Sequence, residues 1–251
     1  MHNPSTFEFN SVIPSNLSSK EIIMIGRTGD GIKRFELGIL AMKTIIKEIP
    51  ECKMNIIGSH FKDLERLIRH SNLENYVNIT GFHTNFENYL KSASLHILTS
   101  LAEAYPMVLS ETKIFGIPTI LCGLDYLALA EGGTVNIYDD NLETIAKEAI
   151  KILKDDKYRK KLGKEARKSM EKIKNDLITK KWVKLLLSVY KDNKDNNDKY
   201  FKKLVSEDGR KKISKKEAEQ IFNNQLKLWI KRAPTIKNTN LDNIKSFFSI
   251  V

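Results

Sequence analysis

The sequence predicts an α/β fold: a doubly wound parallel sheet of the Rossmann-like kind, followed by a helical C-terminal appendage. Three observations lead to this prediction. Short apolar runs alternate with helical patterns over residues 1–150. These runs are apolar on both faces, as expected for strands that helices cover on each side. From Asn141 onward the pattern is purely helical, so the sheet is expected to end there.

Six strands of four or five residues are expected, and right-handed crossovers would make their sheet open and parallel. In chain order they are Ile22–Gly26, Met54–Gly58, Val77–Gly81, Leu95–Thr99, Thr119–Cys122 and Thr134–Tyr138.

Helical patterns separate these strands and continue after the last one. They are expected at Phe35–Ile49, Phe61–His70, Phe86–Ala93, Pro106–Phe115, a short Asp125–Ala130, Asn141–Leu153, Tyr158–Ile173 and Asp176–Tyr190. The last helix carries Trp182 and a leucine-rich stripe, and we expect it to pack back on the sheet.

Three parts of the chain are predicted from these patterns: an N-terminal linker over residues 1–20, a sheet domain over 21–190 and a lysine-rich helical appendage over 191–251. Within the appendage, Ser214-x-x-Glu217 has the spacing of a capping box and marks the start of a helix.

Composition limits the classes of protein that are possible. The chain has 251 residues, 41% of them hydrophobic, which suffices for one packed domain with an appendage but not for two full α/β domains. Its two cysteines, Cys52 and Cys122, lie in apolar runs without metal-ligand spacing, so no metal and a reducing, cytoplasmic compartment are expected. No run approaches the roughly 18 apolar residues that span a bilayer, and residues 1–20 lack the pattern of a secretory signal.

The formal net charge of +11 is unevenly distributed. Residues 1–150 hold 13 Lys and Arg against 18 Asp and Glu, whereas residues 151–251 hold 29 against 13. The excess is mostly lysine interrupted by acids, which favours a solvated surface; an anionic partner or the cytoplasmic face of a membrane is the alternative. Nucleic acid is disfavoured, because its binding surfaces usually combine arginine with aromatic side chains.

Two loops that follow strands carry the charged residues that could bind a ligand or take part in a reaction. In open α/β sheets, ligands bind beyond the carboxyl ends of the strands. The first loop, after Ile22–Gly26, holds Arg27 and Lys33 among glycines. The second, after Leu95–Thr99, holds Glu103 and leads into a helix that carries Glu111.

The start of the second helix is suited to an anion. Pro106 fits a first helical turn because its missing N–H is not needed there. The N–H groups of Met107, Val108 and Leu109 are then available at the positive end of the helix dipole, as for a diphosphate. Glu111 would lie about 7.5 Å along the helix axis, within reach of the hydroxyls of an attached ribose.

On the opposite side of the phosphates, Glu103 would face a hydroxylated sugar. Arg27 and Lys33 would neutralise the diphosphate from the neighbouring loop. Each of these residues taken alone is better explained as a solvated surface group. The histidines add little: His96 is expected to be packed and hydrogen-bonded inside a strand, and His83 is the histidine placed nearest to a ligand.

Taken in order, several motifs resemble a known family. They are Gly26-Arg27-x5-Lys33, the strand ending at Gly58, Gly81 after VNIT, Glu103-x7-Glu111 enclosing Tyr105-Pro106-Met107-Val108-Leu109, and Gly116-Ile117-Pro118. This series resembles the C-terminal, nucleotide-sugar-binding domain of retaining glycosyltransferases of the GT-B fold, family 4. The resemblance runs from about Glu21 to Tyr190.

The resemblance implies the donor-binding half of a hexosyltransferase-type enzyme that transfers a sugar from a UDP- or GDP-sugar with retention, without metal or other cofactor. Arg27 and Lys33 would then contact the diphosphate and Glu103 the sugar. Glu111 would hold the ribose, and Tyr105–Leu109 would offer N–H groups to the phosphates. The base would lie near the strand-end residues Gly26, Gly58, Gly81 and Phe82.

Two departures from the family stand out. Ala104 occupies a place where the family often has glycine, which would restrict the loop if a positive φ is needed. The acceptor-binding domain of the GT-B fold has no counterpart in the sequence. The chain is therefore expected to be a fragment, inactive alone, or to work with a separate acceptor-binding domain or subunit, and its glycan, lipid or protein acceptor stays open.

Two other functions are compatible with the sequence. One is a non-catalytic basic module that binds nucleic acid or an anionic surface. The other is a different GT-B-type enzyme, such as an epimerase or a phosphorylase, although a phosphorylase would need a cofactor lysine that the motifs do not provide.

Overall fold

The computed structural model describes residues 3–27, 31–58 and 62–192, with side chains as far as residue 185. The chain divides into two compact units, Met1–Lys184 and Leu185–Val251. The fold below is that of the first unit. The predicted capping box at Ser214 and most of the basic appendage lie outside the described residues.

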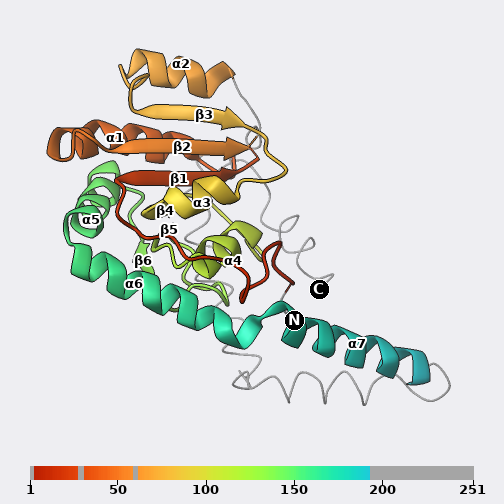
Figure 1. The fold of residues 1–251 in the computed structure, drawn as a ribbon. Helices are drawn as coiled ribbons and strands as arrows, with labels where there is room; N and C mark the ends of the chain where they lie inside the picture. Colours follow the sequence, from red (N-terminus) through yellow and green to blue (C-terminus); the bar gives the residue numbers. More distant parts are fainter. Residues whose placement is uncertain (1–2, 28–30, 59–61, 193–251) are drawn as a thin grey trace. The chain divides into compact units, whose positions relative to one another are not determined.

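The described strands form one parallel sheet in the order β3-β2-β1-β4-β5-β6 (Figure 1). The strands are β1 (Glu21–Gly26), β2 (Lys53–Gly58), β3 (Val77–Gly81), β4 (Leu95–Leu98), β5 (Thr119–Cys122) and β6 (Thr134–Ile137). Each lies within one residue of its predicted bounds. This strand order is that of the dinucleotide-binding α/β fold, so the predicted fold class is confirmed.

The helices between the strands also follow the sequence pattern closely. They are α1 (Phe35–Glu48), α2 (Lys62–His70), α3 (Glu87–Ser92), α4 (Met107–Ile114), α5 (Leu142–Lys154), α6 (Asp156–Ser169), the short 3₁₀ helix η1 (Met170–Ile173) and α7 (Asn175–Asp192). Helix α6 starts before the predicted Tyr158 because the Asp155 side chain accepts a hydrogen bond from the Tyr158 N–H and caps the helix.

One predicted helix is absent. Asp125–Ala130 forms successive turns, in which the N–H groups of Leu127 and Ala130 each donate to a carbonyl three residues back. The buried ammonium of Lys113 also donates to the carbonyls of Leu129 and Glu131. Lys113 therefore anchors the end of this segment from α4, while the segment itself is held in turns by bonds to carbonyls three residues back.

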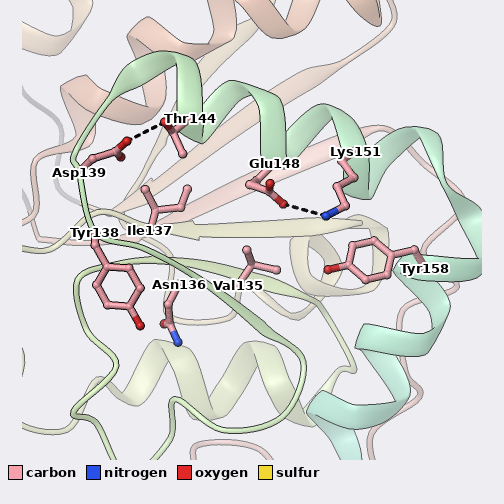
Figure 2. A pocket seen from close by; sticks show the side chains of 9 residues that line it. All are labelled: Val135, Asn136, Ile137, Tyr138, Asp139, Thr144, Glu148, Lys151 and Tyr158. Carbon is pink, nitrogen blue, oxygen red and sulfur yellow. Dashed lines mark hydrogen bonds and ion pairs between the residues drawn. The ribbon is translucent and has the colours of Figure 1, made fainter.

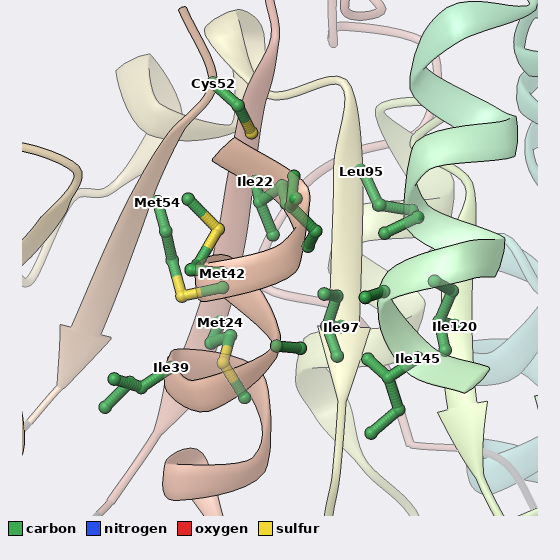
Figure 3. Close-up of a cluster of buried hydrophobic side chains, with 14 of the residues drawn as sticks. Ile22, Met24, Ile39, Met42, Cys52, Met54, Leu95, Ile97, Ile120 and Ile145 are labelled. Atoms are coloured by element: carbon green, nitrogen blue, oxygen red, sulfur yellow. The ribbon is translucent and has the colours of Figure 1, made fainter. Parts of the chain in front are cut away.

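Helices cover both faces of the sheet and form two apolar layers. Side chains of α1 and α5 pack on one face against Ile22, Met24 and their neighbours (Figure 3), and Ile68 of α2 belongs to the same cluster. The other face is covered by α3, α4 and residues from the N-terminal segment. Alternate residues of β1 thus point to opposite layers, which explains why the strand is apolar throughout.

Residues 3–20, expected as a linker, are packed on this second face. The Phe7 ring meets Phe86 and Phe115 edge-on, at centroid distances of 5.5 and 5.1 Å. Two arginines of α6 hold the segment: Arg159 Nε donates to the Leu17 carbonyl at 2.8 Å, and Arg167 Nη2 donates to the Phe9 carbonyl at 2.9 Å. The N-terminal segment is therefore part of the folded unit.

Helix α7 is anchored at its start. Asn175 exchanges two hydrogen bonds with the backbone of Ser5, at 2.7 and 2.9 Å. Ile178 is buried, whereas Trp182, expected as a packing residue, keeps 37% of its surface exposed. No helix among the described residues is long and apolar enough to cross a lipid bilayer.

Candidate functional site

The strand order defines where a ligand would bind. Strands β1 and β4 are neighbours at the centre of the sheet, and the chain leaves them toward opposite faces, through α1 and α4. Such a switch point leaves a crevice beyond the carboxyl ends of the two strands. Both loops that the sequence singled out, one after β1 and one after β4, start at this crevice.

Glycines at the ends of β1 and β2 let the two backbones lie side by side. Gly26 and Gly58 are paired in register. A Cβ on Gly58 would lie 1.8 Å from the Gly26 carbonyl oxygen, and its φ of +148° also favours glycine. Gly81, opposite Ile57, has φ +81° and open space where a Cβ would be. The next residue, Phe82, is 77% exposed.

Lys33 and Glu103 meet across the switch point. The Lys33 ammonium donates to Glu103 Oε1, and the Ser100 hydroxyl donates to the same oxygen at 2.7 Å. The lysine stem passes over Gly26, where an added Cβ would lie 3.4 Å from Lys33 Cε. The cation and the acid that the sequence placed on opposite loops are therefore brought together, although paired with each other.

The backbone of Glu103 is held by Tyr126. The Tyr126 hydroxyl accepts from the Glu103 N–H and donates to the Glu103 carbonyl, both at 3.0 Å. Tyr126 lies in the turns that Lys113 of α4 anchors. Helix α4 thus supports, through Lys113 and Tyr126, the loop that presents Glu103.

Helix α4 starts one residue later than predicted. Pro106 is its N-cap residue, in extended conformation, and the first helical residue is Met107. The N–H of Leu109 donates to the Pro106 carbonyl at 3.0 Å, so the expectation that Leu109 offers its N–H to a phosphate is not met in this conformation. The N–H groups of Met107 and Val108 have no acceptor among the described residues and remain directed out of the helix end.

Glu111 is almost fully buried, with 4% of its surface exposed. Its Oε1 accepts a 2.6 Å hydrogen bond from the Thr6 hydroxyl of the N-terminal segment. Burial raises the pKa of Glu111, and the hydrogen bond from Thr6 opposes that rise. Glu111 is therefore an acid with a positioned acceptor oxygen inside the domain.

The loop between Glu103 and α4 needs no glycine. Ala104 is not among the residues with positive φ, so the departure at Ala104 does not strain the loop. Tyr105 is half-buried and donates to the Asn3 carbonyl at 3.5 Å, and burial raises the pKa of its phenol to about 12.

Three other predicted residues are placed as follows. Arg27 is exposed where β1 ends. His83 Nε2 lies 3.0 Å from the Thr80 carbonyl, with its ring against Tyr89. His96 is packed as expected and has Nδ1 3.3 Å from the Thr119 hydroxyl, but its buried Nε2 has no hydrogen-bond partner among the described residues. Burial, followed by the nearby Lys33 charge, lowers the pKa of His96 to about 3.

Sequence reasoning did not find Thr6, Tyr126 or Arg34. Arg34 lies next to Lys33 and binds Asp140 through both terminal nitrogens. Ser100 has a local signal, since it lies three residues before Glu103 in the same loop. Thr6, Tyr126 and Arg34 instead bind residues that lie 23 to 106 positions away in the sequence. A single sequence carries no spacing pattern at that range.

A cavity of about 500 Å³ lies elsewhere, at the β6 edge of the sheet (Figure 2). It is bordered by β6, α5 and Tyr158 of α6, and Lys151 lies over the Tyr158 ring. None of the residues that the sequence proposed for the site lines this cavity. The candidate site therefore rests on the switch point.

The doubly wound parallel sheet is that of a Rossmann-like domain, with its candidate ligand site at the switch point. The family model described as "Glycosyl transferases group 1" matches residues 6–169. The chain belongs to this family.

Curated relatives are similar over most of the chain. A poly(glycerol-phosphate) α-glucosyltransferase of Bacillus subtilis is 26% identical over 209 residues, which are 80% of this chain and 29% of that protein. An N-acetyl-α-D-glucosaminyl L-malate synthase of Bacillus anthracis is 25% identical over 170 residues, 65% of this chain and 44% of that protein. The chain thus spans less than half the length of these curated relatives.

Solved structures share the fold. Anabaena HepE in complex with UDP and glucose has a TM-score of 0.65 at 17% identity, over 72% of this chain and 55% of that one. An S. aureus TarM variant in complex with Fondaparinux, α-GlcNAc-glycerol and UDP has a TM-score of 0.60 at 22% identity, over 73% of this chain and 37% of that one.

Proposed function

We propose that the chain supplies the donor-binding half of a retaining glycosyltransferase, with a nucleoside-diphosphate sugar as donor. The observation that carries this proposal is the Lys33–Glu103 pair across the switch point, beside the start of α4. A cation and exposed N–H groups at that place suit a diphosphate. UDP is the first nucleotide to test, because the complexes of the fold neighbours named above contain it.

We propose the following roles for the individual residues. Lys33 exchanges its contact with Glu103 for the donor diphosphate, and Arg27 approaches the same phosphates from the end of β1. The N–H groups of Met107 and Val108 complete this anion site. Glu103, released from Lys33, accepts hydrogen bonds from the sugar hydroxyls, and Glu111 accepts them from the ribose.

The reaction breaks the bond between the anomeric carbon and a diphosphate oxygen. The oxygen of an acceptor hydroxyl forms the new bond on the same face of the sugar ring, which gives retention, and the hydroxyl proton passes to the departing diphosphate oxygen. Negative charge grows on the leaving diphosphate, and the charges of Lys33 and Arg27 stabilise it in the transition state. We propose that this pair of cations replaces a metal ion.

The acceptor would bind to a second half of the enzyme. In the GT-B arrangement that half is another Rossmann-like domain, in the same polypeptide or in a separate subunit. The described sheet domain would then bind donor without it, whereas transfer would need both halves.

A thermal-shift panel tests the proposal. A ligand that binds only the folded state at about 100 times its Kd stabilises it by about 2.7 kcal/mol. We therefore expect UDP or GDP to raise the melting temperature by several degrees and uridine or guanosine to raise it less.

The matched variants for this panel are Lys33→Ala and Lys43→Ala, because Lys43 is an exposed lysine of α1. The first should lose the advantage of diphosphate over nucleoside, and the second should keep it. A panel in which neither diphosphate shifts the melting temperature contradicts the donor-binding function.

A further inference from the structure

Arg34, directly after Lys33, has a backbone conformation that is unusual for its residue type. It is the N-cap residue of α1, with φ 47° and ψ 46° in the left-handed region. Residues other than glycine adopt this conformation at an energetic cost, and they keep it where surrounding contacts determine it. The contacts of Arg34 therefore indicate what holds the loop that presents Lys33.

The guanidinium of Arg34 is held on two sides. Its terminal nitrogens donate to the two carboxylate oxygens of Asp140, at 2.9 and 3.0 Å, and its Nε donates to the Thr99 carbonyl at 2.8 Å. The Arg34 and Asp140 side chains are only 11% and 20% exposed, so solvent screens this forked pair weakly. Asp140 also has a positive φ, of 50°, just after β6.

The same contacts join the loops after β1 and β4. The Thr99 hydroxyl donates to the Lys33 carbonyl at 2.7 Å, and the Leu101 N–H donates to the Ile32 carbonyl at 2.7 Å. Together with the Arg34–Thr99 bond, three hydrogen bonds fix the backbone on both sides of Lys33. The Lys33 ammonium lies beyond them, at Glu103.

We infer that Arg34 and Asp140 are positioning residues for diphosphate binding: their forked ion pair holds the loop in the place from which Lys33 reaches the phosphates. This inference rests on the donor-binding function proposed above. Lys33 can then exchange Glu103 for a diphosphate by rotating its side chain, without moving its backbone. Small displacements of a positioned group reduce binding and catalysis strongly, which is why a held backbone matters here.

Two variants separate the ion pair from the backbone conformation. Arg34→Gly removes the guanidinium, and glycine adopts φ 47° without strain. Asp140→Asn removes one charge, and asparagine tolerates the left-handed region. The control is Lys154→Gln, which breaks the exposed Lys154–Glu48 pair of 2.6 Å where α5 and α1 end.

The readout is the ratio of the Kd for uridine to the Kd for UDP, measured by calorimetry on the full chain. We expect Arg34→Gly and Asp140→Asn to lower this ratio about tenfold, the loss of one charge-assisted contact. Uridine affinity should stay the same, and Lys154→Gln should behave like the wild type. In a Lys33→Ala background, Arg34→Gly should lower the ratio little further.

Hydrogen exchange at the Leu101 amide reports on the loop without any ligand. Its bond to Ile32 should open more often in Arg34→Gly and Asp140→Asn, with at least tenfold faster exchange than in the wild type and in Lys154→Gln. Unchanged exchange at Leu101 in both variants would overturn the inference.

The binding data distinguish failure of this inference from failure of the proposed function. A wild type that binds uridine and UDP equally contradicts the donor-binding function, and the inference fails with it. A wild type that prefers UDP, together with an unchanged ratio in Arg34→Gly, overturns the positioning role alone. Equal losses for uridine and UDP would also overturn it, because they indicate a general loss of structure.

Discussion

The hydroxyl of Thr6 donates a 2.6 Å hydrogen bond to Oε1 of Glu111, which joins the N-terminal segment to helix α4 across 105 positions of the sequence. The acid lies inside the domain, and the bond orients one of its two oxygens. If Glu111 binds the ribose hydroxyls, Thr6 determines the orientation in which the Glu111 carboxylate meets them.

Replacing Thr6 should therefore alter recognition of the ribose. Thr6→Val keeps the shape of the side chain and removes the donor, which should weaken UDP binding about fivefold, as expected for a lost hydrogen bond of about 1 kcal/mol. Thr6→Ser keeps the hydroxyl and should bind like the wild type. Calorimetry with UDP and 2′-deoxy-UDP is the measurement, and a Thr6→Val variant that prefers the ribose form as strongly as the wild type would refute the coupling.

Glu111→Gln should stabilise the domain and impair binding. Burial raises the pKa of Glu111 in the folded state above its value in the unfolded chain. At a pH between these two pKa values, the folded state therefore binds more protons than the unfolded state. Stability then falls as the pH rises through this window, and at pH 7 the buried carboxylate opposes folding. A neutral glutamine should raise the melting temperature at pH 7 by about 2–4 °C. This gain in melting temperature should vanish near pH 4. A gain that does not depend on pH would show that the buried carboxylate charge is not its cause.

The strand-end glycines should differ in their tolerance of a side chain. Gly58→Ala would place Cβ 1.8 Å from the Gly26 carbonyl oxygen. We therefore expect the free energy of unfolding to fall by more than about 3 kcal/mol, or the variant to fail to fold. Gly81→Ala meets no atom within 4 Å but keeps φ +81°, so about 1–2 kcal/mol should be lost. Urea unfolding measures the stability of both variants. Equal losses of stability would show that the close approach of the Gly58 and Gly26 backbones does not determine the cost of a side chain at Gly58.

His96 should make the fold sensitive to acid. Burial and the Lys33 charge lower the pKa of His96 to about 3, whereas an unfolded histidine titrates near about 6.5. Between these values the unfolded chain binds the extra proton, so stability falls as the pH falls, by up to about 1.4 kcal/mol per pH unit. His96→Leu should lose less stability than the wild type between pH 7 and 5. As a control, replacing the exposed His70 with leucine should leave the loss of stability between pH 7 and 5 as in the wild type. A His96→Leu variant that loses as much stability as the wild type over this range would contradict the prediction.

Most of the fold was predictable because its signals are local. The six strands are short apolar runs that stand within one residue of their predicted bounds, and Asn141 caps α5 where the pattern became helical. The predicted helix at Asp125–Ala130 was wrong: the segment forms successive turns, and Lys113 of α4 anchors the carbonyls at its end. Local propensity contains no information on a side chain that reaches in from another helix.

The candidate site was predictable only in part, for a related reason. Lys33, Glu103 and Glu111 were proposed because they lie in loops after strands, or in the helix that follows one, at the edge where ligands bind, and the structure brings Lys33 and Glu103 together. The contacts around them were not found, since Thr6 reaches Glu111, Tyr126 reaches Glu103 and Asp140 reaches Arg34, next to Lys33, only after the chain has folded. The availability of the Leu109 N–H was wrongly expected, because this N–H donates to the Pro106 carbonyl, three residues back, in the first turn of α4.

A crystal structure of the chain with UDP tests the central claim most directly. We expect the diphosphate to lie against the N–H groups of Met107 and Val108, with the Lys33 ammonium moved from Glu103 to a phosphate oxygen. Both ribose hydroxyls should lie within hydrogen-bond distance of Glu111. UDP in the cavity at the β6 edge, or a Lys33–Glu103 pair that stays intact beside bound UDP, would contradict it.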